Sequence, residues 1–146
     1  MIRETRPRSR RLMAVLLMST ALSGMALAQP AFAQSEQRAF NAFARSSYNY
    51  CDAKLVGALW GMTPAQGKVE IGRKFLNRIS GNVAGVLAQS RGVGNRCAWE
   101  DTGLTYQDAQ AMASVWGLAT PYQAKLKAAM HYTNGNSYIV NNALGR

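Results

Sequence analysis

Apolar positions follow one another along much of the chain with the period of a helix rather than that of a strand. In residues 65–79, one helical face is apolar or small: Ala65, Val69, Gly72, Phe75 or Leu76, and Ile79. The opposite face carries Glu70 and Lys74, four residues apart in the order that favours an ion pair. No stretch of any length alternates residue by residue, so the sequence predicts an all-α protein.

The helical pattern occurs twice because part of the chain is repeated. The offset between the copies is 56 residues up to a shared Gly and 57 residues after it. The identities that recur in order are Tyr50 and Tyr106, Asp52 and Asp108, Ala53 and Ala109, Trp60 and Trp116, Gly61 and Gly117, Thr63 and Thr120, Pro64 and Pro121, Gln66 and Gln123, and Lys68 and Lys125. A duplicated unit predicts two equivalent substructures, related by an approximate two-fold axis or a screw-like repeat.

Residues typical of helix ends occupy the same places in both copies. Each first helix is expected to begin with a capping residue followed three positions later by an acid. These pairs are Asn49 with Asp52, and Thr105 with Asp108. Each first helix is expected to end at a Trp-Gly pair, since Gly suits the left-handed residue after a helix. Each second helix begins at Thr-Pro-X-Gln, with Thr as cap, Pro in the first position and Gln completing a capping box.

These signals predict the organisation of the whole chain. We expect a leading helix from Ser35 to Ala44, with Phe40 and Phe43 as its apolar face. Two tandem helical hairpins follow, repeat one at about residues 49–91 and repeat two at about 105–146, joined by a Gly-rich linker at 92–104. The second helices are expected to close at Ser80-Gly81-Asn82 and Asn134-Gly135-Asn136. Residues 83–88 and 138–144 are candidates for third helices.

The first 33 residues resemble a cleaved signal peptide. Five arginines precede an uncharged stretch from Leu12 to Leu27, and Ala31-Phe32-Ala33 matches the A-x-A pattern of signal peptidase. We place the cut between Ala33 and Gln34, with Ala26-Leu27-Ala28 as the second choice. An uncleaved anchor is the alternative, although the apolar run is marginal for spanning a bilayer. Residues 34–146 are therefore expected to form one exported all-α domain, periplasmic or secreted, with no membrane-spanning segment.

Removal of the signal peptide lowers the net charge. The full chain has 17 Lys and Arg against 7 Asp and Glu, a net charge of +10; without five Arg and Glu4 it has 12 against 6, close to +6. A basic chain is biased towards anionic partners. Cys51 and Cys97 are expected to form one disulfide in an oxidising compartment. The alternative for Cys51 is a nucleophile at a helix N-terminus, but no His lies near it in the sequence.

The residues kept in both copies are the first candidates for a binding site. We regard Tyr50, Asp52, Trp60, Tyr106, Asp108 and Trp116 as structural anchors of the repeat. A capping role explains the two Asp, and a buried plug at the helix end explains the two Trp. Lys68 and Lys125 remain open between a ligand contact and a salt bridge to the Asp of the same copy. His131 stands alone, so we expect no metal site and only a favourable charge near a helix C-terminus.

The remaining candidates are charged residues. Lys68, Arg73, Lys74, Arg78 and Lys125 form a possible patch for an anionic partner. The alternative for the cations at the end of their helix is that they complement the helix dipole.

We expect a cell-envelope protein without a cofactor or an evident catalytic site, acting as a binding or structural module for a protein or an anionic envelope component. One alternative is an enzyme acting on cell wall or polysaccharide, with Glu100, Asp101 or Asp108 as acid and base. A remoter alternative is a nucleic-acid reader, since residues 111–127 resemble a helix-turn-helix motif. Export argues against a genomic partner.

Overall fold

A computed structural model describes residues 31–146, and these residues form helices without any strand. The elements are α1 (Ala31–Ala44), α2 (Tyr50–Leu59), α3 (Pro64–Leu76), α4 (Gly81–Gly92), the 3-10 helix η1 (Trp99–Thr102), α5 (Tyr106–Val115), α6 (Pro121–Thr133) and α7 (Ser137–Ala143). The all-α prediction is confirmed. The proposed signal sequence lies outside the described residues, apart from its last three, which belong to the first turn of α1.

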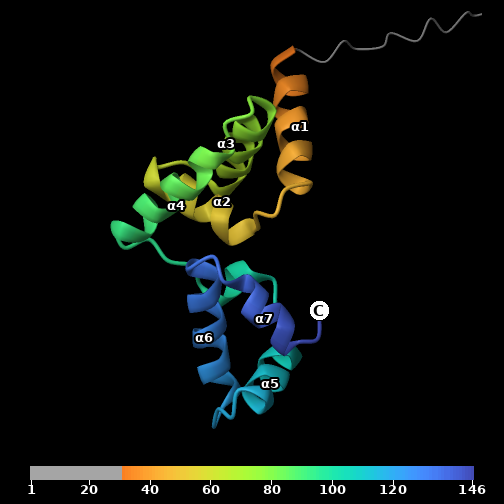
Figure 1. The fold of residues 1–146 in the computed structure, drawn as a ribbon, viewed down its shortest axis with the longest axis vertical. Helices are drawn as coiled ribbons and strands as arrows, with labels where there is room; N and C mark the ends of the chain where they lie inside the picture. The colour runs from red at the N-terminus through yellow and green to blue at the C-terminus, as the bar shows by residue number, and fades with distance from the viewer. Residues whose placement is uncertain (1–30) are drawn as a thin grey trace, which may run out of the picture.

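Equivalent residues of the two copies begin and end equivalent helices. Tyr50 and Tyr106 are the first residues of α2 and α5, and Pro64 and Pro121 are the first residues of α3 and α6. Repeat one thus contains α2, α3 and α4, and repeat two contains α5, α6 and α7. Figure 1 shows α1–α4 gathered in the upper half of the molecule and η1 with α5–α7 in the lower half.

The helix-start signals act as the sequence predicts in three of the four cases. The Asn49 side chain accepts from the backbone N–H of Asp52 at 3.1 Å, and the Asp52 carboxylate accepts from the N–H of Asn49 at 3.0 Å. The same reciprocal pair forms at the start of α5 and at the start of α3. At the start of α6 the Gln123 side chain instead accepts from the N–H of Ala119 at 3.0 Å, one residue before the cap. The α6 capping box is therefore incomplete.

The predicted helix ends are correct for the first helix of each copy and wrong for α3. Gly61 and Gly117 follow the two Trp with φ of 65° and 62°, the left-handed region that favours Gly. The second helix of repeat one ends at Leu76 rather than at residues 80–82, because Arg78 adopts a left-handed φ of 58°. The following helix, α4, continues to Gly92, further than the sequence suggests.

Close backbone approach holds the helices of repeat one together. A Cβ at Gly67 would overlap the carbonyl oxygen of Ala53 on α2, and a Cβ at Gly72 would overlap that of Ala39 on α1. Since no side chain separates these backbones, α3 is packed directly between α1 and α2. The apolar face of α1 consists mainly of Ala39, Ala42 and Phe43, whereas Phe40 is only half-buried.

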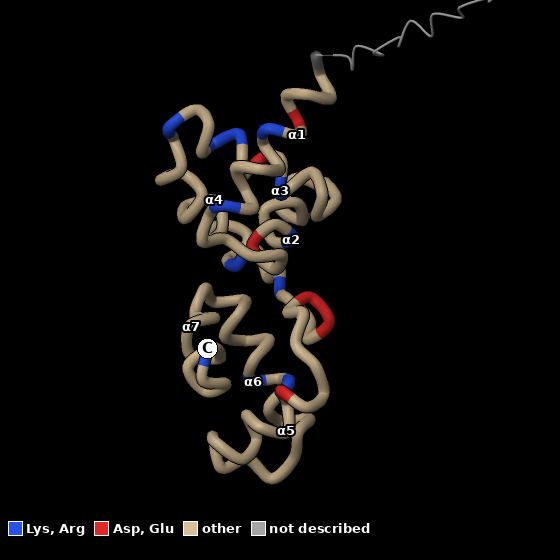
Figure 2. Tube along the Cα trace, turned by 90° about the vertical axis from the view of Figure 1, so that its right-hand side faces the viewer, with Lys and Arg blue, Asp and Glu red and all other residues tan. Residues whose placement is uncertain are grey.

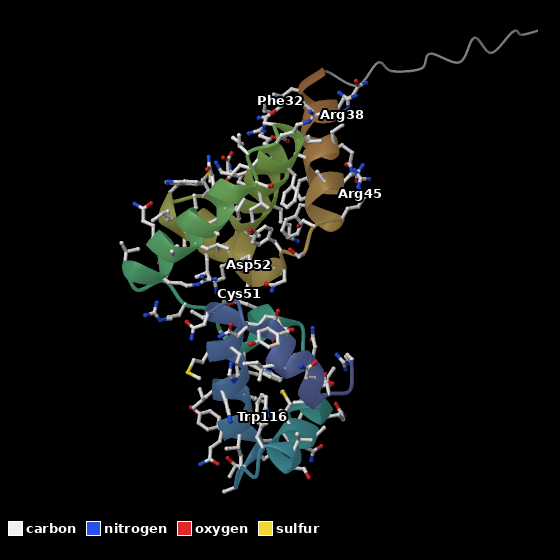
Figure 3. All side chains as sticks on the ribbon, in the orientation of Figure 1. Phe32, Arg38, Arg45, Cys51, Asp52 and Trp116 are labelled. Atoms are coloured by element: carbon white, nitrogen blue, oxygen red, sulfur yellow. A yellow bond between two sulfur atoms is a disulfide. The ribbon has the colours of Figure 1, made fainter. Side chains whose placement is uncertain are left out.

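The two halves share one connected core. Buried residues from both repeats belong to it, including Leu55, Ile71, Met112, Ala128 and Val140. Cys51 at the start of α2 is bonded to Cys97 ahead of η1, with 5.7 Å between their Cα atoms, as predicted. Figure 3 places Cys51 at the boundary between the halves. Among the described residues no helix is long and apolar enough to cross a membrane.

Candidate binding surfaces

Lys68 and Lys125 lie over aromatic rings of their own repeats. The Lys68 ammonium is 5.0 Å from the ring centre of Tyr50, and the Lys125 ammonium is 5.2 Å from that of Tyr106. A second ring lies beside each lysine, Phe43 at 5.8 Å and Trp99 at 5.5 Å. These cation–π contacts account for the recurrence of Tyr and Lys in both copies.

The alternative that each lysine pairs with the Asp of its copy is wrong, because those carboxylates have arginine partners. An oxygen of Asp52 lies 4.0 Å from the Arg91 guanidinium, and one of Asp108 lies 2.6 Å from that of Arg146. Both arginines come from the end of their own repeat, Arg91 in the last turn of α4 and Arg146 at the end of the chain after α7. Each repeat thus joins the start of its first helix to its C-terminal part.

The two equivalent carboxylates have opposite pKa shifts. Asp52 is buried, and burial raises its pKa although the Asn49 N–H and Arg91 act in the other direction. Asp108 is more exposed, and hydrogen bonds from the backbone and side chain of Thr105, followed by the effect of Arg146, lower its pKa. The difference arises because Asp52 faces the junction between the halves, as Figure 3 shows.

The expectation that both repeated Trp are buried is wrong for Trp60. Its side chain is 46% exposed, whereas that of Trp116 is partly buried against the core. Gly57 and Gly67 let the backbones of α2 and α3 approach so closely that no indole fits between the helices. Trp60 therefore lies at the rim, with the Lys74 ammonium 5.8 Å from its ring.

His131 occupies the position in repeat two that Lys74 occupies in repeat one. Its ring centre is 5.8 Å from that of Trp116, and its Nε2 is buried without a hydrogen-bond partner in the described part of the chain. Burial, and secondarily the charge of Lys127, lower the pKa of His131. His131 lies in the last turn of α6, as expected for a residue that complements the helix dipole, but its surroundings disfavour the charged ring.

A cleft of about 420 Å³ lies between the halves. Its lining includes Tyr48, Asp52, Arg91, Asn134 and Tyr138. Burial raises the pKa of Tyr48, and the nearby carboxylate of Asp52 adds to this rise. The cleft is therefore walled by both repeats and by polar groups from each.

Hydrogen bonds at this junction involve Thr133 at the end of α6. The Arg91 Nε–H donates to the Thr133 carbonyl, and the Cys97 N–H donates to the Thr133 hydroxyl at 2.9 Å. In repeat one, the buried hydroxyl of Ser90 donates to the Leu55 carbonyl at 2.6 Å. These contacts hold the linker and α4 against the helices on either side of the junction, so we interpret the cleft as part of the connection between the repeats.

The acidic residues considered for catalysis lie near the linker. Asp101 accepts from the N–H of Ala98 at 2.7 Å and forms an ion pair with Lys54 at 2.5 Å. Its neighbour Glu100 is exposed on η1. Asp108 is held by its cap and by Arg146. Among residues 31–146 no cluster of three His, Cys, Asp or Glu side chains has metal-binding geometry.

The structure distributes the predicted basic patch over both halves. Lys68 and Lys74 are half-buried, and Lys74 forms the predicted ion pair with Glu70 at 3.2 Å. Arg73 is exposed with Glu36 at 3.8 Å, Arg78 is exposed just after α3, and Lys125 lies in the other half. The exposed cations of the set are thus the two arginines.

Two further arginines belong with them. Arg38 on α1 and Arg45, the residue directly after α1, are seven residues apart and exposed, and Figure 3 shows both on the side away from α3. Within the described residues no carboxylate lies within ion-pair distance of Arg38, Arg45 or Arg78. The spacing of seven is a signal that sequence reasoning could have used.

Comparison of the chain with protein-family models, with curated proteins and with solved structures finds no match in any of the three.

Proposed function

We propose that this protein is an exported, disulfide-bonded helical module of the cell envelope that binds an anionic partner through its α1–α4 half. The observation that supports this most strongly is the uneven distribution of charge. Residues 31–92 carry eight Lys and Arg against three Asp and Glu, whereas residues 93–146 carry four against three. In Figure 2 most of the blue segments accordingly belong to the half that contains α1, α3 and α4.

The exposed cations of this half are arginines, which suits an anionic partner. Arg38, Arg45, Arg73 and Arg78 are exposed, whereas the lysines of the same half are half-buried against aromatic rings or carboxylates. A guanidinium presents a planar fork of donors that matches carboxylate and phosphate groups. We call these four residues the arginine set, and we place the envelope partner on them.

Export supports the same function. The N-terminal sequence has the features of a signal peptide, and a stable disulfide suits the periplasm or the outside of the cell. The alternative of an enzyme has less support. Its candidate acid and base, Asp101 and Asp108, already accept cap hydrogen bonds and form ion pairs. The half that resembles a helix-turn-helix motif is nearly neutral, so a nucleic-acid partner is also less favoured.

The direct test is sedimentation of the processed protein with isolated envelopes at low and high salt. We expect the recovered protein to begin at Gln34 and to sediment with envelopes at low ionic strength. Binding is expected to weaken as salt rises, because exposed charges are screened beyond about 8 Å at physiological ionic strength. Protein that still begins at Met1, or binding that salt does not change, would contradict the proposal.

A further inference from the structure

The cleft between the two halves contains an arginine and a carboxylate that lie near each other without a direct hydrogen bond. Arg91 on α4 and Asp52 on α2 both line it, and Oδ1 of Asp52 is 4.0 Å from Nη2 of Arg91. A hydrogen bond between such charged groups has a length of about 2.7–2.9 Å. The Asp52 side chain is only 7% exposed and that of Arg91 only 25%. Both charges are therefore largely withdrawn from water, where an incomplete set of partners is costly.

The corresponding pair of repeat two is closed. Asp108, the counterpart of Asp52, accepts a hydrogen bond of 2.6 Å from the guanidinium of Arg146. This pair is the more exposed of the two, since the Arg146 side chain is 59% exposed. The pair in the cleft is more buried and yet remains open. The cause of the separation therefore lies in the surroundings of Asp52 and Arg91.

Each group of the open pair is held by a hydrogen bond to another part of the chain. The second oxygen of Asp52 accepts from the N–H of Asn49, at 3.0 Å, in the capping box of α2. The Nε–H of Arg91 donates to the carbonyl of Thr133 at the end of α6. One anchor belongs to repeat one and the other to repeat two. These bonds fix the two side chains in the positions that keep them 4.0 Å apart.

The other atoms of the pair retain their hydrogen-bonding capacity. Within residues 31–146, Oδ1 of Asp52 and the two terminal nitrogens of Arg91 take part in no hydrogen bond. Gly135 also lines the cleft, and a Cβ at this position would lie 3.2 Å from Nη2 of Arg91. The absence of a side chain at Gly135 thus leaves that nitrogen accessible. The cleft therefore offers two N–H₂ donor groups beside one carboxylate acceptor.

The charges of the pair favour a ligand that carries both signs. A simple anion would be repelled by Asp52, and a simple cation would be repelled by Arg91. A ligand with a carboxylate next to an ammonium group satisfies both residues at once. Its carboxylate accepts from the planar fork of the guanidinium, and its ammonium donates to the Asp52 oxygen. An α-amino acid has this arrangement, because a single carbon joins its two charged groups.

The rest of the lining indicates the kind of side chain that such a ligand carries. Tyr48 and Leu87 contribute carbon surface from repeat one, and Tyr138, which is 60% exposed, contributes a ring from α7. Asp52 and Arg91 are the only charged residues among the described residues that line the cleft. Its volume of about 420 Å³ falls in the range of about 300–1,000 Å³ that is usual for small-ligand sites. An apolar or aromatic side chain therefore fits better than a charged one.

We propose that the cleft between the repeats binds a free α-amino acid with an apolar or aromatic side chain, with Arg91 on its carboxylate and Asp52 on its ammonium. The two residues are held in place before the ligand arrives, which lowers the cost of ordering them on binding. Since the lining comes from both repeats, the bound ligand also connects the two halves. None of the four residues of the arginine set lines the cleft, so this site is separate from the surface proposed for the envelope partner.

Titration of the processed protein with L-leucine, L-methionine and L-phenylalanine, followed by NMR of the backbone amides, tests the site. At least one of them should give saturable shifts around the cleft, with a Kd between about 10 µM and about 1 mM. The N-acetyl derivative of the tightest ligand lacks the ammonium, and its amide derivative lacks the carboxylate. Each derivative should bind at least about ten-fold more weakly, because it leaves one charged group without its partner. No saturable shift up to about 10 mM of any of the three amino acids, or equal binding of either derivative, would overturn the proposal.

Variants of the two equivalent carboxylates test the assignment of residues. Asp52→Asn removes the charge but keeps an acceptor for the α2 cap, and it should weaken binding at least about ten-fold. The matched control, Asp108→Asn, makes the same change at the α5 cap and should bind like the wild type. Tyr138→Ala changes an exposed ring, so it should fold and weaken binding several-fold even if Asp52→Asn does not fold. Unchanged binding by Tyr138→Ala, or equal weakening by the two Asp variants, would contradict the site. Failure here leaves envelope binding by the arginine set to its own test.

Discussion

At the scale of single residues, the same side chain performs the same local task in both repeats but differs in its surroundings. Asp52 and Asp108 both accept the hydrogen bond of a capping box. Burial raises the pKa of Asp52, so its contribution to stability falls as pH rises through the range above 3.8. Asp108 has a lowered pKa, so its contribution is present above 3.8 and is lost as pH falls. The two shifts thus oppose each other.

His131 should make the protein less stable in mild acid. Its pKa is lowered from 6.5, so the unfolded chain binds the proton more tightly than the folded chain. The stability that this group contributes is complete above 6.5 and is lost as pH falls below it. Urea unfolding at pH 7.5 and 5 should therefore show a smaller pH dependence for His131→Phe than for the wild type. Identical pH dependence of the two proteins would contradict the buried, neutral ring.

At the scale of elements, the packing of α3 depends on two glycines. Gly72→Ala should push α1 away from α3, because the new methyl would overlap the Ala39 carbonyl. Overpacking of this kind typically lowers the free energy of unfolding by about 1–3 kcal/mol. The control is Gly85→Ala in α4, where a Cβ meets nothing within 4 Å. That change should stabilise the protein by about 0.5–1 kcal/mol, and chemical denaturation of both variants checks the contrast. A neutral Gly72→Ala would refute the close approach.

The elements that the sequence predicts well are those with local signals. Capping residues and Pro define the starts of α2, α3, α5 and α6, and Gly follows the ends of α2 and α5, because each acts on backbone groups within a few residues. The left-handed Arg78 has no such signal, so the end of α3 was misplaced. The rim position of Trp60 depends on two glycines from different helices, and the covering of α3 by α1 depends on distant residues. Neither follows from local pattern.

The same limit applies to the candidate site. The net positive charge and its arginines can be counted from the sequence, but which cations remain exposed cannot. Lys68 and Lys125 lie over rings contributed by an earlier element of the chain, and Lys74 is half-buried beside Glu70. Only the folded arrangement separates these from exposed Arg38 and Arg45. The exposed arginines therefore lie on α1 and α3 and directly after these helices, whereas the lysines of the predicted patch, Lys68, Lys74 and Lys125, are half-buried.

At the scale of the whole molecule, the disulfide joins repeat one to the linker. Cys51 and Cys97 are separated by 46 residues, and both are buried. In the chain-entropy model a closed loop of this length stabilises the folded state by roughly 4 kcal/mol. Reduction should therefore lower the urea midpoint strongly, without a change in the envelope binding of any protein that remains folded. An unchanged midpoint after verified reduction would show that the loop contributes little.

The central claim is that the position of positive charge, and not its total, directs binding to an anionic envelope component. Two double variants change the net charge equally. The α1 variant is Arg38→Gln with Arg45→Gln, in α1 and directly after it, and the α5 variant is Gln107→Glu with Gln110→Glu on the exposed face of α5. Substitution of such surface residues usually changes stability by no more than about 0.5 kcal/mol, so both should fold.

The decisive measurement is the affinity of these two variants and the wild type for isolated envelopes at a series of salt concentrations. The α1 variant should bind several-fold more weakly and with a smaller salt dependence, since two guanidinium groups are lost from the contact. The α5 variant should bind almost like the wild type. Equal weakening of both variants would show that only the total charge matters, and unchanged binding of the α1 variant would contradict the assignment of the arginine set.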